Sequence, residues 1–224
     1  MITKFEQVED LFKEVEKFVE RKVCIYVIGG AVLLEQNLKL VTKDIDLVVA
    51  TKEDFMQVQK AFEKCGFKAR IPGVEYKHMN LSQILEKGDY RIDLFEREVC
   101  GKFSLSENMI KRAREVISLK NMKVFLSANE DVFLLKCMTE RDGDLLDCES
   151  LVVPGIDWKA ILQELKSQIK KSGEDVWITW IGERFDLLEE RNKIKIPIMN
   201  EINKLREQYF EKYEEELKNR KEKK

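Results

Sequence analysis

The sequence has one histidine and three prolines in 224 residues, and its five cysteines form no C-x-x-C pair. A structural zinc site is not expected, because such sites take four cysteine or histidine ligands at short spacings. Scattered cysteines in apolar or helical contexts indicate reduced, packed thiols. We therefore expect a cytoplasmic protein.

Long apolar runs are also missing. No run approaches the roughly 18 residues that a membrane span needs, and the charged N-terminus lacks the apolar core of a secretory signal. The net charge of −2 gives no bulk attraction for nucleic acid or for a membrane surface. With 44% hydrophobic and 37% charged residues, the composition is that of a globular protein with one large or two small domains.

The most informative stretch runs from Val23 to Val49. It contains, in order, an apolar strand, a glycine pair, a helix and a second strand with two acids: Val23–Ile28, Gly29-Gly30, Ala31–Leu38 and Asp44–Val49. Glycines let a backbone approach a ligand closely. The helix that follows offers free N–H groups and the positive end of its dipole to a phosphate.

Asp44 and Asp46 share one face of the second strand, because side chains alternate between the faces of a sheet. Two adjacent carboxylates repel each other unless a cation lies between them, and oxygen ligands suit Mg²⁺ or Mn²⁺. A Gly-Gly or an Asp-x-Asp alone is usually only a turn or a pair of surface acids. Together, in this order and spacing, they indicate phosphoryl or nucleotidyl transfer.

A third acid lies in the strongly predicted strand Tyr90–Glu96. Alternation places Arg91, Asp93 and Phe95 on one face of this strand. Asp93 has two interpretations: it pairs with Arg91 or a nearby lysine, or it is the third acid of the same metal site.

The remaining pattern predicts an α/β domain, 1–152, and an all-helical C-terminal domain, 153–224. The helices that spacing and capping predict are Ile2–Arg21, Lys52–Cys65, Ser106–Ala113, Asp131–Glu140, Trp158–Lys170, Glu174–Arg191 and a last one from Pro197. Further strands are predicted at Phe67–Ile71, Glu75–Leu81, Glu115–Leu119 and Lys123–Leu126, with a turn at Gly88-Asp89.

Three motifs of this chain resemble the pattern of the nucleotidyltransferase superfamily that includes DNA polymerase beta: Ile28-Gly29-Gly30, Asp44-Ile45-Asp46-Leu47 and Ile92-Asp93-Leu94. The local sequence GGAVLL…TKDIDLVV resembles more closely the small prokaryotic nucleotidyltransferases of the toxin and abortive-infection branch. The resemblance covers 23–95 well and continues more weakly to Leu151. It implies a mixed sheet flanked by helices.

The resemblance also implies roles for individual residues. Asp44 and Asp46 would hold the divalent ions, Mg²⁺ or Mn²⁺, that bridge the phosphates of an NTP. Asp93 would complete a second ion site and help to deprotonate the acceptor hydroxyl. Gly29 and Gly30 would cradle the β- and γ-phosphates.

Next to the acidic strand, Thr42 could donate its hydroxyl to the site. Many relatives of the toxin branch carry an arginine two residues before this threonine, where the present chain has Leu40 with Lys39 beside it. The identity of the cation that assists the phosphates is therefore left open.

A downstream segment resembles the toxin branch's pattern of a lysine, then an arginine, then Asp-x-x-Asp: Lys136, Arg141, Asp144 and Asp147. In one interpretation Lys136 reaches a phosphate. In the other, the four residues form a helix-surface lattice of ion pairs. For Asp144 and Asp147 we favour the structural interpretation.

His78, the only histidine, falls in the predicted strand Glu75–Leu81, with Tyr76 and Asn80 on the same face. Lone histidines are easily structural, and contact with substrate is the less favoured interpretation.

The predicted function is metal-dependent transfer of an NMP from an NTP to an acceptor hydroxyl on RNA, protein or a small molecule, with release of pyrophosphate. A toxin–antitoxin setting is expected from the resemblance, and a homodimer through the apolar stripe of the last helix from the pattern. Two alternatives stay open: a nucleotide-binding or regulatory module without turnover, and an interaction protein that acts through its helical C-terminus.

Overall fold

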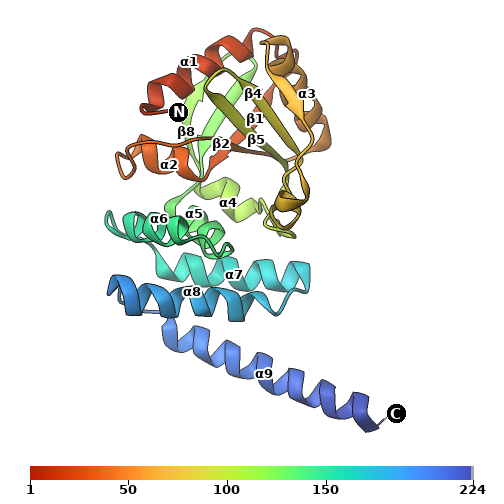
Figure 1. Ribbon diagram of the computed structural model, residues 1–224, viewed down its shortest axis with the longest axis vertical. Coiled ribbons are helices and arrows are strands. Elements are labelled where there is room, and N and C mark those ends of the chain that lie inside the picture. The colour runs from red at the N-terminus through yellow and green to blue at the C-terminus, as the bar shows by residue number, and fades with distance from the viewer. Residues whose placement is uncertain (223–224) are drawn as a thin grey trace. The chain divides into compact units, whose positions relative to one another are not determined.

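Alternating apolar residues in the first half of the chain build one mixed sheet (Figure 1). The computed structural model describes the backbone of residues 1–222, and their side chains except at 75, 192 and 220–222. The seven strands follow the order β3-β4-β5-β2-β1-β9-β8. Their bounds are β1 Val23–Ile28, β2 Ile45–Val49, β3 Lys68–Arg70, β4 Gln83–Lys87, β5 Tyr90–Glu96, β8 Arg114–Ser118 and β9 Met122–Leu126.

The sheet is parallel at two places, where β2 pairs with β5 and β1 pairs with β9. Its other pairs, β1 with β2, β3 with β4, β4 with β5 and β8 with β9, are antiparallel. The predicted α/β fold with a mixed sheet is therefore confirmed.

One face of the sheet holds the core. Ile25, Ile45, Leu47 and Ile92 are inaccessible to solvent. Two helices, α1 (Phe5–Glu16) and α3 (Lys52–Lys64), pack together through the edge-to-face rings of Phe12 and Phe62, and α3 also contacts β1 to β5. Because this face must be buried, the strand register is fixed and the polar residues are directed to the opposite face.

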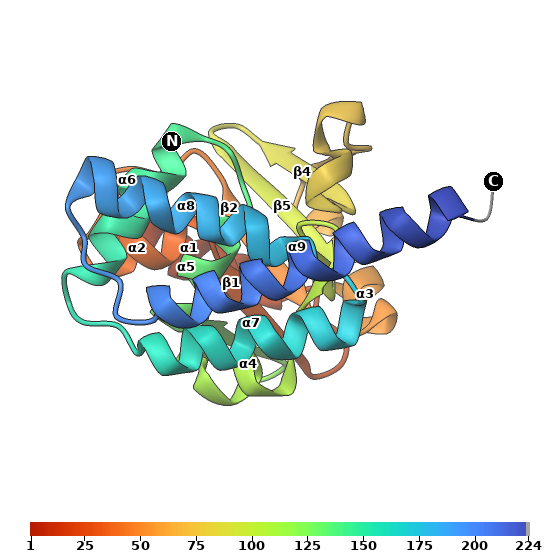
Figure 2. The same cartoon turned by 90° about the horizontal axis from the view of Figure 1, so that it is seen from below.

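Short elements complete the first half of the chain: α2 Gly30–Glu35, the 3₁₀ helix η1 Val74–Met79, the strand pair β6 Glu98–Val99 and β7 Phe103–Ser104, and α4 Glu107–Arg112. The second half is helical, from α5 Asn129–Cys137 through α6 Asp142–Val152, α7 Trp158–Ser172, α8 Trp177–Asn192 and α9 Met199–Glu222. Helices α7, α8 and α9 lie side by side (Figures 1 and 2).

The chain forms two compact units that divide within α5, between Leu135 and Lys136. The boundary predicted from the sequence is later, between 152 and 153, because the pattern changes there from mixed α/β to wholly helical. No helix within residues 1–222 combines the length and the hydropathy needed to cross a membrane.

The prediction of a strand at Glu75–Leu81 was wrong. This segment forms η1, which ends at Asn80 in the left-handed region at φ 57°. The strand lies instead at β4, joined to β5 by the two-residue turn Gly88-Asp89. The predicted turn at Gly88-Asp89 is present, but the five residues before it, 83–87, were not predicted to form a strand. The β6–β7 pair was not predicted.

Candidate active site

Two of the predicted acids are neighbours on adjacent strands. Asp46 of β2 and Asp93 of β5 are register partners in the parallel pair, so their side chains leave the same face of the sheet. Asp44 directly precedes β2, and alternation gives it the same side. Its charge also acts on Asp93, where it raises the pKa of the carboxyl group. The three acids therefore lie on the same side of the sheet, and their sharing of one metal site stays a prediction.

The glycine turn lies directly against two side chains of the acidic segment. Gly29 ends β1 at φ 68°, and a Cβ atom added there would collide with Oδ2 of Asp46. A Cβ atom added at Gly30 would lie 2.6 Å from Oγ1 of Thr42. Only a backbone without side chains fits beside these groups, so the two glycines let Asp46 and Thr42 lie directly against the turn.

Substitution of Gly29 by alanine should destabilise the chain by more than the roughly 1–2 kcal/mol of left-handed backbone strain, because the new methyl group also displaces Asp46. The matched control is Gly88→Ala, which has φ 56° but no neighbouring atom within 4 Å of its Cβ position. Urea unfolding of both variants measures the difference. Equal losses of stability would contradict a close contact between the turn and Asp46.

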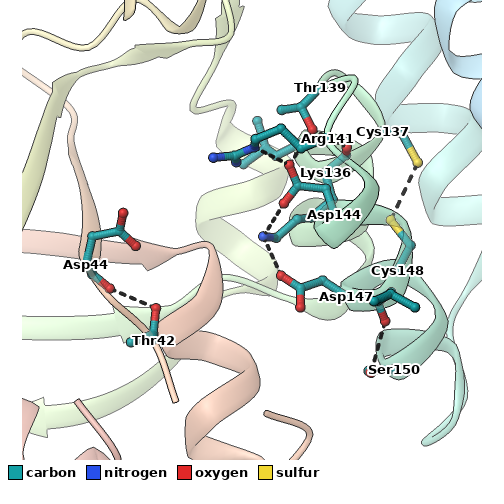
Figure 3. Close-up of polar contacts among 12 residues, drawn as sticks. Thr42, Asp44, Lys136, Cys137, Thr139, Arg141, Asp144, Asp147, Cys148 and Ser150 are labelled. Carbon is teal, nitrogen blue, oxygen red and sulfur yellow. Dashed lines mark hydrogen bonds and ion pairs between the residues drawn. The ribbon is translucent and has the colours of Figure 1, made fainter. Parts of the chain in front are cut away.

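Thr42 is buried, and its hydroxyl donates a hydrogen bond of 3.0 Å to the backbone oxygen of Asp44 (Figure 3). Its backbone exchanges two hydrogen bonds of 2.9 Å with Ile2. Thr42 thus fixes the backbone that carries Asp44. The predicted donation of its hydroxyl to a nucleotide stays a prediction.

The sequence did not show whether the side chain of Lys39 reaches the glycine turn. Its Nζ atom lies 3.8 Å from the Cβ position of Gly30, at the glycine turn, whereas Leu40 is 88% exposed. A cation therefore lies beside the turn even though the expected arginine is replaced by Leu40. The lysine was visible in the sequence, but only the fold of the segment after α2 shows that it turns back toward Gly30.

Asp93 is 3% exposed and holds a bidentate ion pair with Arg91. Nε of Arg91 donates to Oδ1 at 2.7 Å, and Nη2 donates to Oδ2 at 2.9 Å. Burial raises the pKa of the Asp93 carboxyl group, and the charge and hydrogen bonds of Arg91 oppose that shift without cancelling it. The pairing with Arg91 is the simpler of the two interpretations that the sequence offered.

These donors fit a divalent cation in part. Asp44 and Asp46 are half-buried carboxylates, and Mg²⁺ commonly takes one or two carboxylates together with substrate phosphates. Within the part of the chain that the structure describes, no three His, Cys, Asp or Glu side chains are grouped closely enough to hold one ion. The Asp44–Asp46 pair beside the glycine turn therefore suits an ion that arrives with phosphates.

Lys136 lies in the second unit, where its ammonium group contacts Oδ1 of Asp144 at 2.7 Å and Oδ2 of Asp147 at 2.6 Å (Figure 3). Asp144 also accepts hydrogen bonds from the hydroxyl of Thr139 and, at 2.7 Å, from Nε of Arg141. Lys136 is only 9% exposed. Lys136, Asp144 and Asp147 form a buried cluster of ion pairs, which Arg141 joins with a side chain that is 64% exposed. The structural interpretation expected these ion pairs on a helix surface, and contact of Lys136 with a phosphate stays a prediction.

His78 is exposed on η1 rather than aligned with Tyr76 and Asn80 along a strand, so the shared face inferred from alternation does not exist. Tyr76, in contrast, stacks on Arg91, with 5.2 Å between the ring centroid and the guanidinium carbon. Nothing in the local sequence indicates this contact, because it joins η1 to a strand that follows it by more than ten residues.

Comparison with known proteins gave one family match. The model of a family described as "Nucleotidyltransferase of unknown function (DUF6036)" matches residues 3–187. No curated protein matched the chain. Two solved structures are similar at 12% identity and a TM-score of 0.41. They are the crystal structure of ANT(2″)-Ia in complex with adenylyl-2″-tobramycin, covering 80% of this chain and 98% of that one, and a solution structure of the antibiotic-resistance factor ANT(2″)-Ia, covering 84% and 98%.

Proposed function

Because the chain belongs to the family of nucleotidyltransferases of unknown function DUF6036, we propose that it transfers a nucleoside monophosphate from an NTP to an acceptor hydroxyl and releases pyrophosphate. The observation that carries the proposal is the register of Asp46 with Asp93 on adjacent parallel strands, with Asp44 beside them and the glycine turn against Asp46. This arrangement pairs carboxylates with an open backbone turn, which nucleotidyl transfer requires.

In the proposed reaction, Asp44 and Asp46 would hold Mg²⁺ or Mn²⁺. When bound, such an ion neutralises phosphate charge and orients the reacting groups. The backbone at Gly29 and Gly30 accommodates the β- and γ-phosphates, and the nearby ammonium group of Lys39 adds a positive charge at that turn.

The acceptor hydroxyl oxygen attacks the α-phosphorus, and the bond from that phosphorus to the bridging oxygen of pyrophosphate breaks. We assign the hydroxyl proton to Asp93. A raised pKa suits a proton acceptor, and each carboxylate oxygen keeps a second lone pair while it is bonded to Arg91.

The acceptor that we propose is a hydroxyl group on RNA, protein or a small molecule. The remaining expectations are also proposals: a cytoplasmic, toxin–antitoxin setting and a homodimer through the C-terminal helices. On the outer half of α9, Phe210, Tyr213 and Leu217 are 40–50% exposed, which is the stripe that a second chain would cover.

The experiment that tests the function is incubation of the chain with each α-labelled NTP, Mg²⁺ or Mn²⁺, and total cellular RNA, protein or metabolites. We expect one labelled product class together with pyrophosphate. Binding of metal–NTP without pyrophosphate against any acceptor would instead favour the nucleotide-binding module. If loss of the helices from α7 onward removed the cellular effect while Asp44 and Asp46 were dispensable, the interaction protein would be favoured.

A further inference from the structure

Arg91 is held in place from two sides. Two of its nitrogens bind both oxygens of Asp93, at 2.7 and 2.9 Å, and the ring of Tyr76 covers its guanidinium group at 5.2 Å. Its side chain is 25% exposed and that of Asp93 is 4% exposed. A planar guanidinium group that matches a carboxylate in this bidentate manner and stacks on an aromatic ring forms a specific, rigid unit.

The position of this unit gives it a chemical role. Asp93 adjoins Asp46 in the parallel register, so the guanidinium group is bound to the acid that would otherwise complete a second ion site. An arginine side chain does not lose its proton in proteins, so the positive charge of Arg91 beside Asp93 is permanent at any working pH. A second divalent ion bound to Asp93 would lie next to this guanidinium group, whose positive charge repels it.

The charges at the site agree with a resident guanidinium group. Among these groups, one divalent ion and one guanidinium group balance the three carboxylates of Asp44, Asp46 and Asp93, while Lys39 and the phosphates of an NTP add further charges of opposite sign. A second divalent ion would place two more positive charges next to the guanidinium group, which repels them.

We propose that Arg91 takes the place of the second divalent cation, so that the nucleotide site binds a single ion, on Asp44 and Asp46. This inference rests on the proposed function. It makes Arg91 the fixed cationic partner of Asp93, and Tyr76 the residue that holds Arg91 in that position.

The test is Mn²⁺ binding measured by electron paramagnetic resonance with a non-hydrolysable α,β-methylene NTP. Two Mn²⁺ ions about 4 Å apart give a spin-coupled spectrum, and one ion gives an isolated six-line spectrum. We expect the natural chain to bind about one uncoupled Mn²⁺. Arg91→Gln should bind about two ions with the coupled spectrum, because Asp93 is then released to act as a ligand.

Two further variants are informative. Arg91→Lys retains the positive charge and should keep the uncoupled spectrum. Arg70→Gln is the matched control, because Arg70 forms an exposed ion pair with Glu86 at 3.9 Å on the neighbouring strands, and it should behave as the natural chain does. Circular dichroism verifies that each variant is folded. If Arg91→Gln does not fold, the spectra of the natural chain and of Arg91→Lys decide.

A spin-coupled pair of ions in the natural chain would overturn the role of Arg91, and so would a folded Arg91→Gln variant that still binds one ion. Other results would contradict the proposed function itself: no binding of the Mn²⁺–nucleotide complex, or unchanged binding in the Asp44→Asn/Asp46→Asn variant. A coupled pair that disappears in that variant would retain the proposed function and overturn only the inference about Arg91.

Discussion

Replacement of Asp44 and Asp46 by asparagine should lower the rate of nucleotide transfer at least about 10³-fold while the chain still folds. The two carboxylates supply the negative oxygens for the divalent ion, and an amide oxygen is a neutral and weaker ligand. Both side chains are half-buried at the start of one strand, and asparagine has almost the same volume, so packing is preserved. The rate of pyrophosphate release, with each NTP and the acceptor found, gives the measurement.

The control for this variant is a double substitution of the same type at exposed acids, Asp10→Asn/Asp89→Asn. Asp10 pairs with Lys13 on the surface of α1, and Asp89 lies in the turn before β5. We expect this control to transfer nucleotide at the natural rate. Undiminished pyrophosphate release from Asp44→Asn/Asp46→Asn, with the melting temperature unchanged, would rule out the assigned active site.

The positions of the acids were predictable because a local rule fixes them. The apolar residues Ile45 and Leu47 must face the core, so Asp46 must face the other side, and the same alternation applies to Asp93 between Ile92 and Leu94. Which strands pair was not predicted: the resemblance to the superfamily implied only that the acids serve one site, and the structure shows the parallel pairing that makes Asp46 and Asp93 neighbours.

The surroundings of the acids could not be predicted in the same way. Lys39 and Tyr76 reach the site from irregular or 3₁₀ segments, where no periodicity relates a side chain to a face. The strand β4 was missed because its apolar core is only Ile84-Leu85, and the segment predicted in its place, Glu75–Leu81, carries a tyrosine, a methionine and a leucine that fit a strand equally well. Tertiary contacts decide such segments.

Lys136→Met should destabilise the helical unit by about 3–5 kcal/mol, since breaking a buried ion pair by removal of one partner leaves a buried charge without compensation. Two carboxylates, Asp144 and Asp147, lie within 2.7 Å of the ammonium group and are 4% and 7% exposed. Methionine fills a similar volume, so the loss of stability reflects the missing positive charge and not a cavity. Urea unfolding at neutral pH measures it.

The matched control is Lys212→Met, which removes an equally short ion pair, 2.6 Å to Asp175, from an exposed place on α9. We expect no measurable change there, because exposed pairs are screened by water. A variant that combines Lys136→Met with Asp144→Asn and Asp147→Asn should recover most of the stability, since no buried charge then remains. If the triple variant is as unstable as Lys136→Met alone, the loss comes from packing.

The difference in stability between the natural chain and Lys136→Met should depend on pH in a defined direction. Burial raises the pKa of Asp144, but the charge and hydrogen bond of Lys136 outweigh that effect and lower it below the ordinary value. Burial lowers the pKa of Lys136, and the two carboxylates outweigh this and raise it. The cluster therefore contributes its full stability above the ordinary pKa of aspartate, near 4, and below that of lysine, near 10. In the variant, Lys136 no longer opposes the effect of burial, so Asp144 takes up a proton at a higher pH than in the natural chain. The difference should therefore shrink as the pH falls from neutral through the lowered pKa of Asp144 in the natural chain, and a difference that grows in acid would contradict the assignment.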